Sequence, residues 1–289
     1  MVAAEKIILK CCNVQSGNST LLNIICDVKN TYLDIIESPN QKTIRFIELV
    51  GLSVSEYNYG RHYSSYLLFR EAMSYLDTRM LIKNLTSECF FRLRTKKTVN
   101  PDEMFHIPME ERYKVGTRRY SFPGLPCLYF GSSVDVCKLE SLNNSSCDYS
   151  IAQYKLKEGV FCKVFDLTYF FSMNYDEMDE ETMQSFIDLL PLIILCSIRC
   201  DYPNDANVRF KKEYIIPQML LEYIMDNQPH EMNNVIGIKY RSVYHMHDIW
   251  EKEEQRQMWN NYVFPAITNL PTGFSPKLFE LFPFVGFVH

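Results

Sequence analysis

The chain has 289 residues, of which 47% are hydrophobic, and it carries a formal net charge of −5. This length allows one large core or two smaller ones, and the acidic balance without Lys/Arg blocks argues against a general nucleic-acid or anionic-membrane binder. The longest apolar run, LLPLIILCSI, is too short to span a membrane, and the first residues lack a secretory-signal pattern, so we expect a cytoplasmic protein.

Residues 1–85 have the pattern of helices. The stretch STLLNIICDVKNTYLDIIES places apolar side chains at helical spacing behind a Ser/Thr start, and two later stretches continue in the same style. This region does not concentrate catalytic residue types. We expect a helical N-terminal region that packs on, or regulates, the part of the chain that follows.

From residue 86 the chain changes to short strand-like segments. ECFFRLRT, LPCLYFG, GVFCKVFDL and VIGIKYRSV are typical of strands. MDEETMQSFIDLL predicts an amphipathic helix that Pro191 ends, LIILCSIRC predicts a core strand, and YIIPQMLLEYIMDN predicts another helix. The tail after Trp250 gives no assignment. We therefore predict, over residues 86–289, an α+β domain with a mixed or largely antiparallel sheet.

Common cofactor and metal patterns are missing from the sequence. The ten cysteines contain no CxxC pair and no zinc spacing with histidine, so we expect reduced, mostly buried thiols. The glycines form neither GxGxxG nor GxxxxGK, which disfavours a Rossmann dehydrogenase or a P-loop NTPase. His245 and His247 have a spacing that could bind a metal, but no nearby ligand set supports it, and we expect a loop there and no metal site.

Charged and hydroxyl side chains interrupt several of the apolar stretches. Arg92 and Arg94 lie on one face of a predicted strand. Glu140 ends an apolar run, and Ser242 ends a later strand. Each alone is compatible with an edge-strand charge, a solvated helix end or a capping hydroxyl. Together with a tyrosine between them, they supply an anion grip, a carboxylate and a stacking surface, which are the parts needed to cleave an N-glycosidic bond through a cationic transition state.

Five segments between residues 88 and 245 have the order and spacing of a known family: ECFFRLR, MFHIPMEERYKVGTRRYSFPGLPCLYFGSSVDVCKLE, VFDLTYF, LPLIILCSIRC, and FKKEYIIPQMLLEYIM followed by VIGIKYRSV. With these segments the chain resembles the RES domain, named for its Arg, Glu and Ser positions. The block from residue 104 to 140 is the most specific. The resemblance implies a fold similar to that of ADP-ribosyltransferases. It also implies degradation of NAD, in studied members by phosphorolysis to nicotinamide and ADP-ribose-1″-phosphate.

Carried over position by position, the resemblance assigns catalytic roles to Arg92, Glu140 and Ser242, with Arg94 as the register alternative to Arg92. In this interpretation Arg92 holds the phosphates of NAD or incoming inorganic phosphate. Glu140 binds a ribose hydroxyl and stabilises the oxocarbenium-like transition state. Ser242 orients phosphate or ribose.

The same comparison implies a set of substrate-binding residues. Tyr129 is expected to stack near nicotinamide, and Arg119 to line the anion pocket. His106 is either a residue that supports the site or a satisfied buried histidine. The sequence departs from the family at Leu93, where some members have a tyrosine. It also departs at residues 137–140, where CKLE has one carboxylate fewer than the family pattern CWEE.

The sequence therefore predicts an enzyme that cleaves the nicotinamide–ribose bond of NAD, with phosphate or water as acceptor, and acts as a toxin or defence effector. NAD and inorganic phosphate are the expected small-molecule partners, without a further cofactor. The resemblance implies an Xre-like helix-turn-helix antitoxin as protein partner, and neither nucleic acid nor membrane is expected to bind directly. Two alternative functions stay open: a mono-ADP-ribosyltransferase that acts on a macromolecule, and a non-catalytic nucleotide sensor. Self-association of the protein through the N-terminal helices also stays open.

Overall fold

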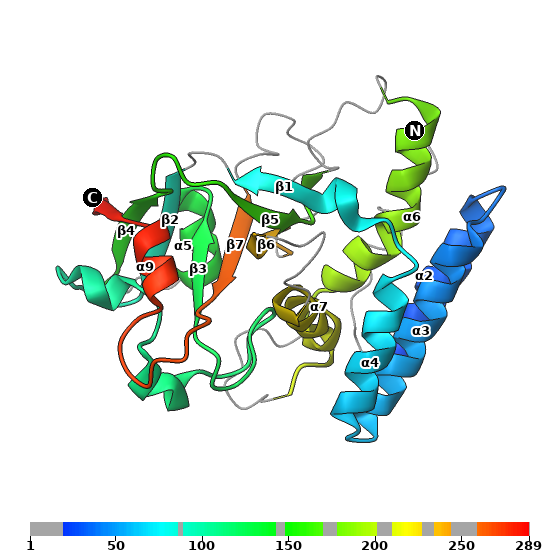
Figure 1. Ribbon diagram of the computed structural model, residues 1–289, viewed down its shortest axis with the longest axis horizontal. Helices are drawn as coiled ribbons and strands as arrows, with labels where there is room; N and C mark the ends of the chain where they lie inside the picture. Colours follow the sequence, from blue (N-terminus) through cyan, green and yellow to red (C-terminus); the bar gives the residue numbers. More distant parts are fainter. Residues whose placement is uncertain are drawn as a thin grey trace. The chain divides into compact units, whose positions relative to one another are not determined.

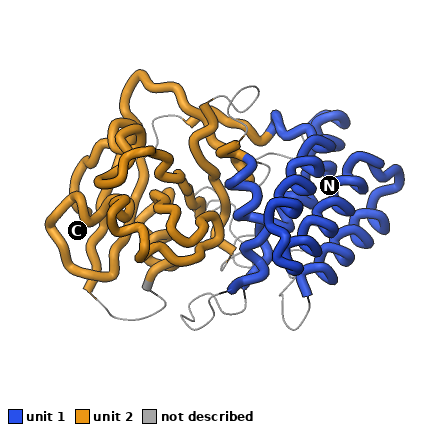
Figure 2. Tube along the Cα trace, turned by 60° about the horizontal axis from the view of Figure 1, so that its bottom comes forward, with its two compact units in different colours: residues 1–80, 173–223 blue, residues 81–172, 224–289 orange. Residues whose placement is uncertain are grey.

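The chain divides into two compact units, one helical and one built on a β-sheet. The computed structural model describes residues 20–85, 89–142, 148–169, 178–200, 210–226, 234–243 and 259–288. The helical unit contains residues 1–80 and 173–223, and the sheet unit contains residues 81–172 and 224–289 (Figure 2). This division differs from a single boundary at residue 85, because residues 173–223 return to the helical unit.

The helical unit begins with α2 (Leu21–Ile35), α3 (Gln41–Asn58) and α4 (His62–Met73), in agreement with the helical pattern (Figure 1). The hydroxyl of Thr20 accepts a hydrogen bond from the amide of Asn23 at 3.2 Å and thereby caps α2. Gly60 turns the chain between α3 and α4 with a φ of 76°. A residue with a Cβ adopts that backbone conformation less readily, so glycine suits the turn.

Asp188 fastens α6 (Glu180–Cys196) to the first helices of this unit. Its Oδ1 accepts a hydrogen bond from the hydroxyl of Tyr32 at 2.9 Å, and its Oδ2 accepts one from the side-chain amide of Asn40 at 2.5 Å. Burial raises the pKa of Tyr32 to about 12. These half-buried polar contacts join segments that lie 156 and 148 positions apart in the sequence.

Two predictions at Pro191 are wrong. We expected Pro191 to end a helix and LIILCSIRC to form a strand, but α6 continues through Pro191 to Cys196. A proline inside a helix lacks the amide that would bond the carbonyl four residues earlier. Every residue from Leu189 to Cys196 is nevertheless buried. The free energy gained by burying this apolar surface outweighs the loss of one backbone hydrogen bond at Pro191.

Within the described residues, eight strands form one sheet in the spatial order β1-β5-β6-β7-β3-β2-β4-β8 (Figure 1). In chain order, β1 to β8 span Ile82–Leu85, Cys89–Arg94, Cys127–Gly131, Ser150–Lys155, Cys162–Asp166, Val235–Arg241, Asn260–Pro265 and Phe284–Val288. β5 and β6 are parallel, and all other neighbouring strands are antiparallel. The predicted α+β class with a largely antiparallel sheet is confirmed.

In the described part of the sheet unit, three α-helical segments accompany the sheet: α5 (Val134–Leu142), the last turn of α7 (Ile215–Asp226), and α9 (Pro276–Leu281). α5 contacts β2 and β3. One core of the unit is a cluster of buried aromatic side chains that includes Phe90, Phe130, Tyr154, Tyr262, Phe264 and Phe282. In the described ranges no helix combines the length and the apolar character needed to cross a membrane.

The sheet is discontinuous between β2 and β3. β2 pairs with β4 through all six of its residues, Cys89–Arg94, but it pairs with β3 only through Phe91 and Gly131. Beyond that pair the two strands no longer form a ladder. The side chain of Arg92 reaches from β2 to β3 at this place, where it contacts the backbone of Tyr129.

Candidate active site

Arg92 brings a buried positive charge to the place where β2 and β3 separate. It is 7% exposed, and its Nη1 donates a hydrogen bond to the backbone carbonyl of Tyr129 at 3.0 Å. Among the described residues its buried Nε has no hydrogen-bond partner, and none of their carboxylates pairs with it. Burial, and next the charge of Arg94, push the pKa of Arg92 well below its usual value. Since a guanidinium stays protonated in proteins, an anion bound here would relieve an uncompensated charge.

Arg94 lies two residues further along the same strand and has a different set of contacts. Its Nε donates to the carbonyl oxygen of Glu103 at 3.2 Å, and its Nη2 donates to that of Phe105 at 2.8 Å. Arg94 therefore fastens the 3₁₀ helix Pro101–Met104 and the residue after it to β2. Among the residues that the structure describes, Arg92 keeps a buried N–H without a partner, so of the two arginines it is the better placed to take up an anion.

His106 is a neutral histidine held between backbone groups. Its Nδ1 lies 2.7 Å from the carbonyl oxygen of Ile107, and its Nε2 accepts a hydrogen bond from the amide of Ser275 at 2.9 Å. The carbonyl requires a proton on Nδ1, and the amide requires a bare Nε2, which together fix one tautomer. Burial lowers the pKa of His106 to about 4. Both nitrogens are thus engaged by the backbone, an arrangement that links the loop after β2 to the start of α9.

Glu140 lies on α5, a helix that the sequence analysis did not predict. The Oγ of Ser133 accepts a hydrogen bond from the amide of Val136 at 3.2 Å, which satisfies an amide in the first turn. Four residues after Val136 on the same helix, the Oε1 of Glu140 accepts a hydrogen bond from the Nδ2 of Asn261 at 3.0 Å. Asn261 is 6% exposed and lies on β7, between β6 and β3. The carboxylate is therefore oriented by a buried amide of the central sheet.

Tyr240 on β6 marks the centre of a cluster of aromatic and charged side chains. Burial raises its pKa, the charges of Tyr129, Glu140 and Tyr120 raise it further, and the charge of Arg119 lowers it. The rings of Tyr120 and Tyr240 have centroids 4.7 Å apart and planes inclined at 48°. Burial also raises the pKa of Tyr129. The cluster thus brings the carboxylate, an arginine and several aromatic faces within electrostatic reach of one another.

Ser242 follows directly after β6 and lies two positions beyond Tyr240. It is 1% exposed, and its backbone amide donates to the carbonyl oxygen of Trp259 at 3.2 Å. Its hydroxyl is buried and has no hydrogen-bond partner in the part of the chain that the structure describes. A buried hydroxyl without a partner costs free energy, and a bound ligand with a donor or acceptor would remove that cost.

Cys137 on α5 links the arginine and the carboxylate. Burial raises the pKa of its thiol to about 12, and the nearby charges of Arg92 and Glu140 act on this pKa in opposite directions. Both charges therefore lie close to the same sulfur atom. The structure brings Arg92, Tyr129 and Glu140 together at the junction of β2 and β3, whereas Arg94 and His106 are committed to the loop that follows β2.

The site also includes residues that sequence reasoning missed. Asn261, which orients Glu140, lies in the tail that received no assignment. Tyr240 was inside a predicted strand, and its spacing of two from Ser242 was the signal that could have placed both on one strand face. Among the described residues, no group of three or more His, Cys, Asp or Glu side chains could hold a metal ion. His245 and His247 lie outside the described residues.

Comparison with known proteins adds one relative. No family model and no solved structure matches the chain. The chain is similar to a protein of Bacillus subtilis (strain 168) that is named "Putative toxin YopC", with 31% identity over 269 residues. The alignment covers 86% of this chain and 57% of the relative, so the chain spans little more than half the length of the curated protein that it matches. The similarity thus extends over most of both units and links the chain to a protein named as a toxin.

Proposed function

We propose that the protein degrades NAD by cleaving the bond between nicotinamide and ribose, on a fold similar to that of ADP-ribosyltransferases. One observation carries the proposal: Arg92 is a buried cation with an unpartnered Nε and no carboxylate partner among the described residues, and it lies in the same region as Tyr129 and Glu140. A dinucleotide supplies what these groups lack. Its phosphate oxygens match the guanidinium, and its ribose hydroxyls match a carboxylate acceptor.

Arg92 takes the phosphate-binding role in this proposal. Its Nη1 is used by the carbonyl of Tyr129, which holds the guanidinium in one orientation and leaves Nε for a ligand oxygen. Arg119, which is 8% exposed and lowers the pKa of Tyr240 through its charge, adds a second positive charge to this region. Inorganic phosphate is the proposed co-substrate, and the same two charges suit it.

Glu140 takes the role of stabilising the transition state. Loss of nicotinamide leaves positive charge on the anomeric carbon, and an oriented carboxylate lowers the energy of that state. The hydrogen bond from Asn261 holds one oxygen of Glu140, so the other remains available for a ribose hydroxyl. Nicotinamide departs as a neutral ring, so that side of the bond needs no general acid. Ser242, with its unpartnered buried hydroxyl, orients phosphate or ribose.

A toxin role follows as part of the same proposal. The relative from Bacillus subtilis is named as a toxin, and an enzyme that consumes NAD would be harmful to the cell that contains it. We expect an antitoxin protein of the Xre-like helix-turn-helix type to restrain it. The helical unit is a candidate surface for that contact.

The test is to incubate the purified chain with NAD, with and without inorganic phosphate, and to follow nicotinamide release. The matched variants are Glu140→Gln and Glu158→Gln; Glu158 is an exposed carboxylate of the same unit that forms a salt bridge with Lys155 three residues away. Wild type and Glu158→Gln should release nicotinamide at the same rate, and Glu140→Gln should be slower by about 10²–10³. If wild type releases none under either condition, the proposed activity is wrong.

Labelled NAD separates the proposed reaction from its alternatives. Free ADP-ribose-1″-phosphate indicates phosphorolysis, and free ADP-ribose indicates hydrolysis. Label retained on protein or nucleic acid would instead indicate an ADP-ribosyltransferase. Binding of NAD without turnover would indicate a nucleotide sensor.

A further inference from the structure

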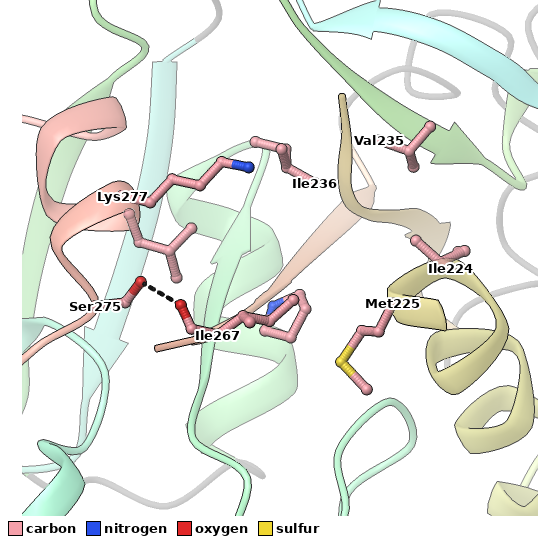
Figure 3. Close-up of a pocket in the computed structure, with 9 residues that line it drawn as sticks. Ile224, Met225, Val235, Ile236, Ile267, Ser275 and Lys277 are labelled. Atoms are coloured by element: carbon pink, nitrogen blue, oxygen red, sulfur yellow. Dashed lines mark hydrogen bonds between the residues drawn. The ribbon is translucent and has the colours of Figure 1, made fainter. Parts of the chain in front are cut away.

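A cavity of the sheet unit lies away from the candidate active site. Its volume is about 240 Å³, and its walls come from the last turn of α7, the start of β6, the end of β7 and α9 (Figure 3). The lining residues are Ile224, Met225, Val235, Ile236, Pro265, Ile267, Ser275, Lys277 and Leu278. None of these residues belongs to the candidate active site, so the cavity and that site are separate places on the molecule.

The cavity is apolar on most sides and polar on one. Seven of its nine lining residues are apolar, and Ser275 and Lys277 supply the polar wall at the start of α9. In Figure 3 the side chain of Lys277 extends along the wall toward Ile236, whereas Met225 and Ile224 lie across the cavity from α9. One end of a ligand would thus contact apolar side chains, and the other end would contact Ser275 and Lys277.

Lys277 is a cation available to a ligand. It is exposed, and no carboxylate among the described residues forms an ion pair with it, although Lys157 pairs with the neighbouring Glu280 at 2.7 Å. Ser275 has a hydroxyl that is weakly used: its Oγ lies 3.4 Å from the carbonyl oxygen of Ile267, longer than an ordinary O–H···O hydrogen bond. An ammonium and a hydroxyl of this kind together suit a carboxylate.

The volume limits the size of the ligand. At about 30 Å³ for a water-sized group, a cavity of 240 Å³ holds about eight non-hydrogen atoms. Apolar cavities of this size take up apolar ligands readily, since water gains few hydrogen bonds inside them. The fitting class is an alkyl chain of about seven carbons with an anionic head outside the apolar part.

We infer that this cavity binds a medium-chain carboxylate, with the alkyl tail among Ile224, Met225 and Val235 and the carboxylate at Lys277 and Ser275. The inference stands without the proposed NAD cleavage, because no residue is shared between the two sites. Charge complementarity selects the carboxylate over a neutral ligand, and the volume selects a chain near eight carbons.

The experiment is a titration of the full chain with octanoate, octanol and hexanoate, followed by the methyl resonances of ¹³C-labelled methionine and isoleucine. The methyl resonance of Met225 should change its chemical shift as octanoate is added, and the change should reach saturation. Octanol should bind about fivefold more weakly for lack of the ion pair. Hexanoate should bind about tenfold more weakly, because two methylenes fewer are buried.

Three variants make the titration specific. Lys277→Gln should weaken the affinity for octanoate about fivefold and leave the affinity for octanol unchanged. Lys42→Gln, at an exposed lysine of the helical unit, should change neither. Ile267→Trp, at a residue that is 56% exposed, should close the cavity to both ligands. If the tryptophan variant does not fold, Lys277→Gln carries the test. No saturable shift at Met225, equal affinity for octanol and octanoate, or unchanged octanoate affinity in Lys277→Gln would each overturn the inference.

Discussion

The buried His106 predicts that the sheet unit loses stability as the pH falls. Its two ring nitrogens bond the carbonyl of Ile107 and the amide of Ser275, and the second bond requires the neutral ring. A proton on Nε2 would replace an acceptor by a donor facing the Ser275 N–H. The folded state therefore resists protonation, and the pKa of His106 lies at about 4.

The size and direction of the effect follow from the state that binds the proton. An unfolded histidine titrates at its ordinary value of 6.5, and the folded one at about 4. Between these values the unfolded chain binds a proton that the folded chain does not, so the free energy of unfolding decreases as the pH falls. The difference of about 2.5 pKa units corresponds to about 3 kcal/mol at 1.36 kcal/mol for each unit. Above pH 6.5 this histidine contributes no pH dependence.

The assay is urea unfolding from neutral pH down to pH 4, followed by tryptophan fluorescence, because both tryptophans, Trp250 and Trp259, belong to the sheet unit. The reference is His106→Gln, which can still accept the bond from Ser275 and does not titrate. Carboxylates that also titrate in this range cancel in the difference between the two proteins. We expect wild type to be more stable at neutral pH and to lose about 3 kcal/mol relative to the variant by pH 4. A difference that stays constant over this range would refute the reasoning.

Three further changes test other parts of the structure. Under the proposed function, Asn261→Ala removes the donor that orients Glu140 and should lower kcat for NAD about tenfold with little change in KM; a raised KM with unchanged kcat would point to substrate binding instead. Asp188→Ala removes the acceptor that joins α6 to Tyr32 and Asn40 and should lower the free energy of unfolding by about 2 kcal/mol, measured by far-UV circular dichroism in urea, with a smaller loss for Asp188→Asn. Gly237→Ala would place a Cβ 2.2 Å from the carbonyl oxygen of Val263 on the neighbouring strand. It should destabilise the sheet by about 3 kcal/mol or more, and an unchanged Tm would contradict that expectation.

The strands that carry Arg92 and Tyr129, and the strand that Ser242 follows, could be predicted from the sequence, since short apolar segments with alternation and flanking turn residues identify strands locally. The helix that carries Glu140 was missed although its start had a signal. Ser133 caps the first turn and Asp135 follows in it, a pattern typical of a helix N-terminus.

Other parts of the fold depend on contacts that no local pattern contains. Pro191 stays within a helix because burial on the helical unit outweighs the missing hydrogen bond, and only the packed structure provides that burial. Asn261 reaches Glu140 because β7 inserts between β6 and β3, and this pairing joins residues 121 positions apart. Strand order of this kind is set by long-range packing, so the sequence predicted the class of sheet but not the neighbours of each strand.

The break between β2 and β3 connects the stability of the sheet to the proposed chemistry. A continuous ladder there would satisfy more backbone groups and leave no room for a guanidinium, whereas the single pair Phe91–Gly131 admits Arg92. A buried cation without a carboxylate partner among the described residues weakens the fold that contains it. Sites that depart from local rules of stability are commonly those at which a ligand completes the structure. Under the proposed function, the space that weakens the sheet is the place where the phosphate groups of NAD bind, next to the carboxylate that Asn261 of β7 holds in position.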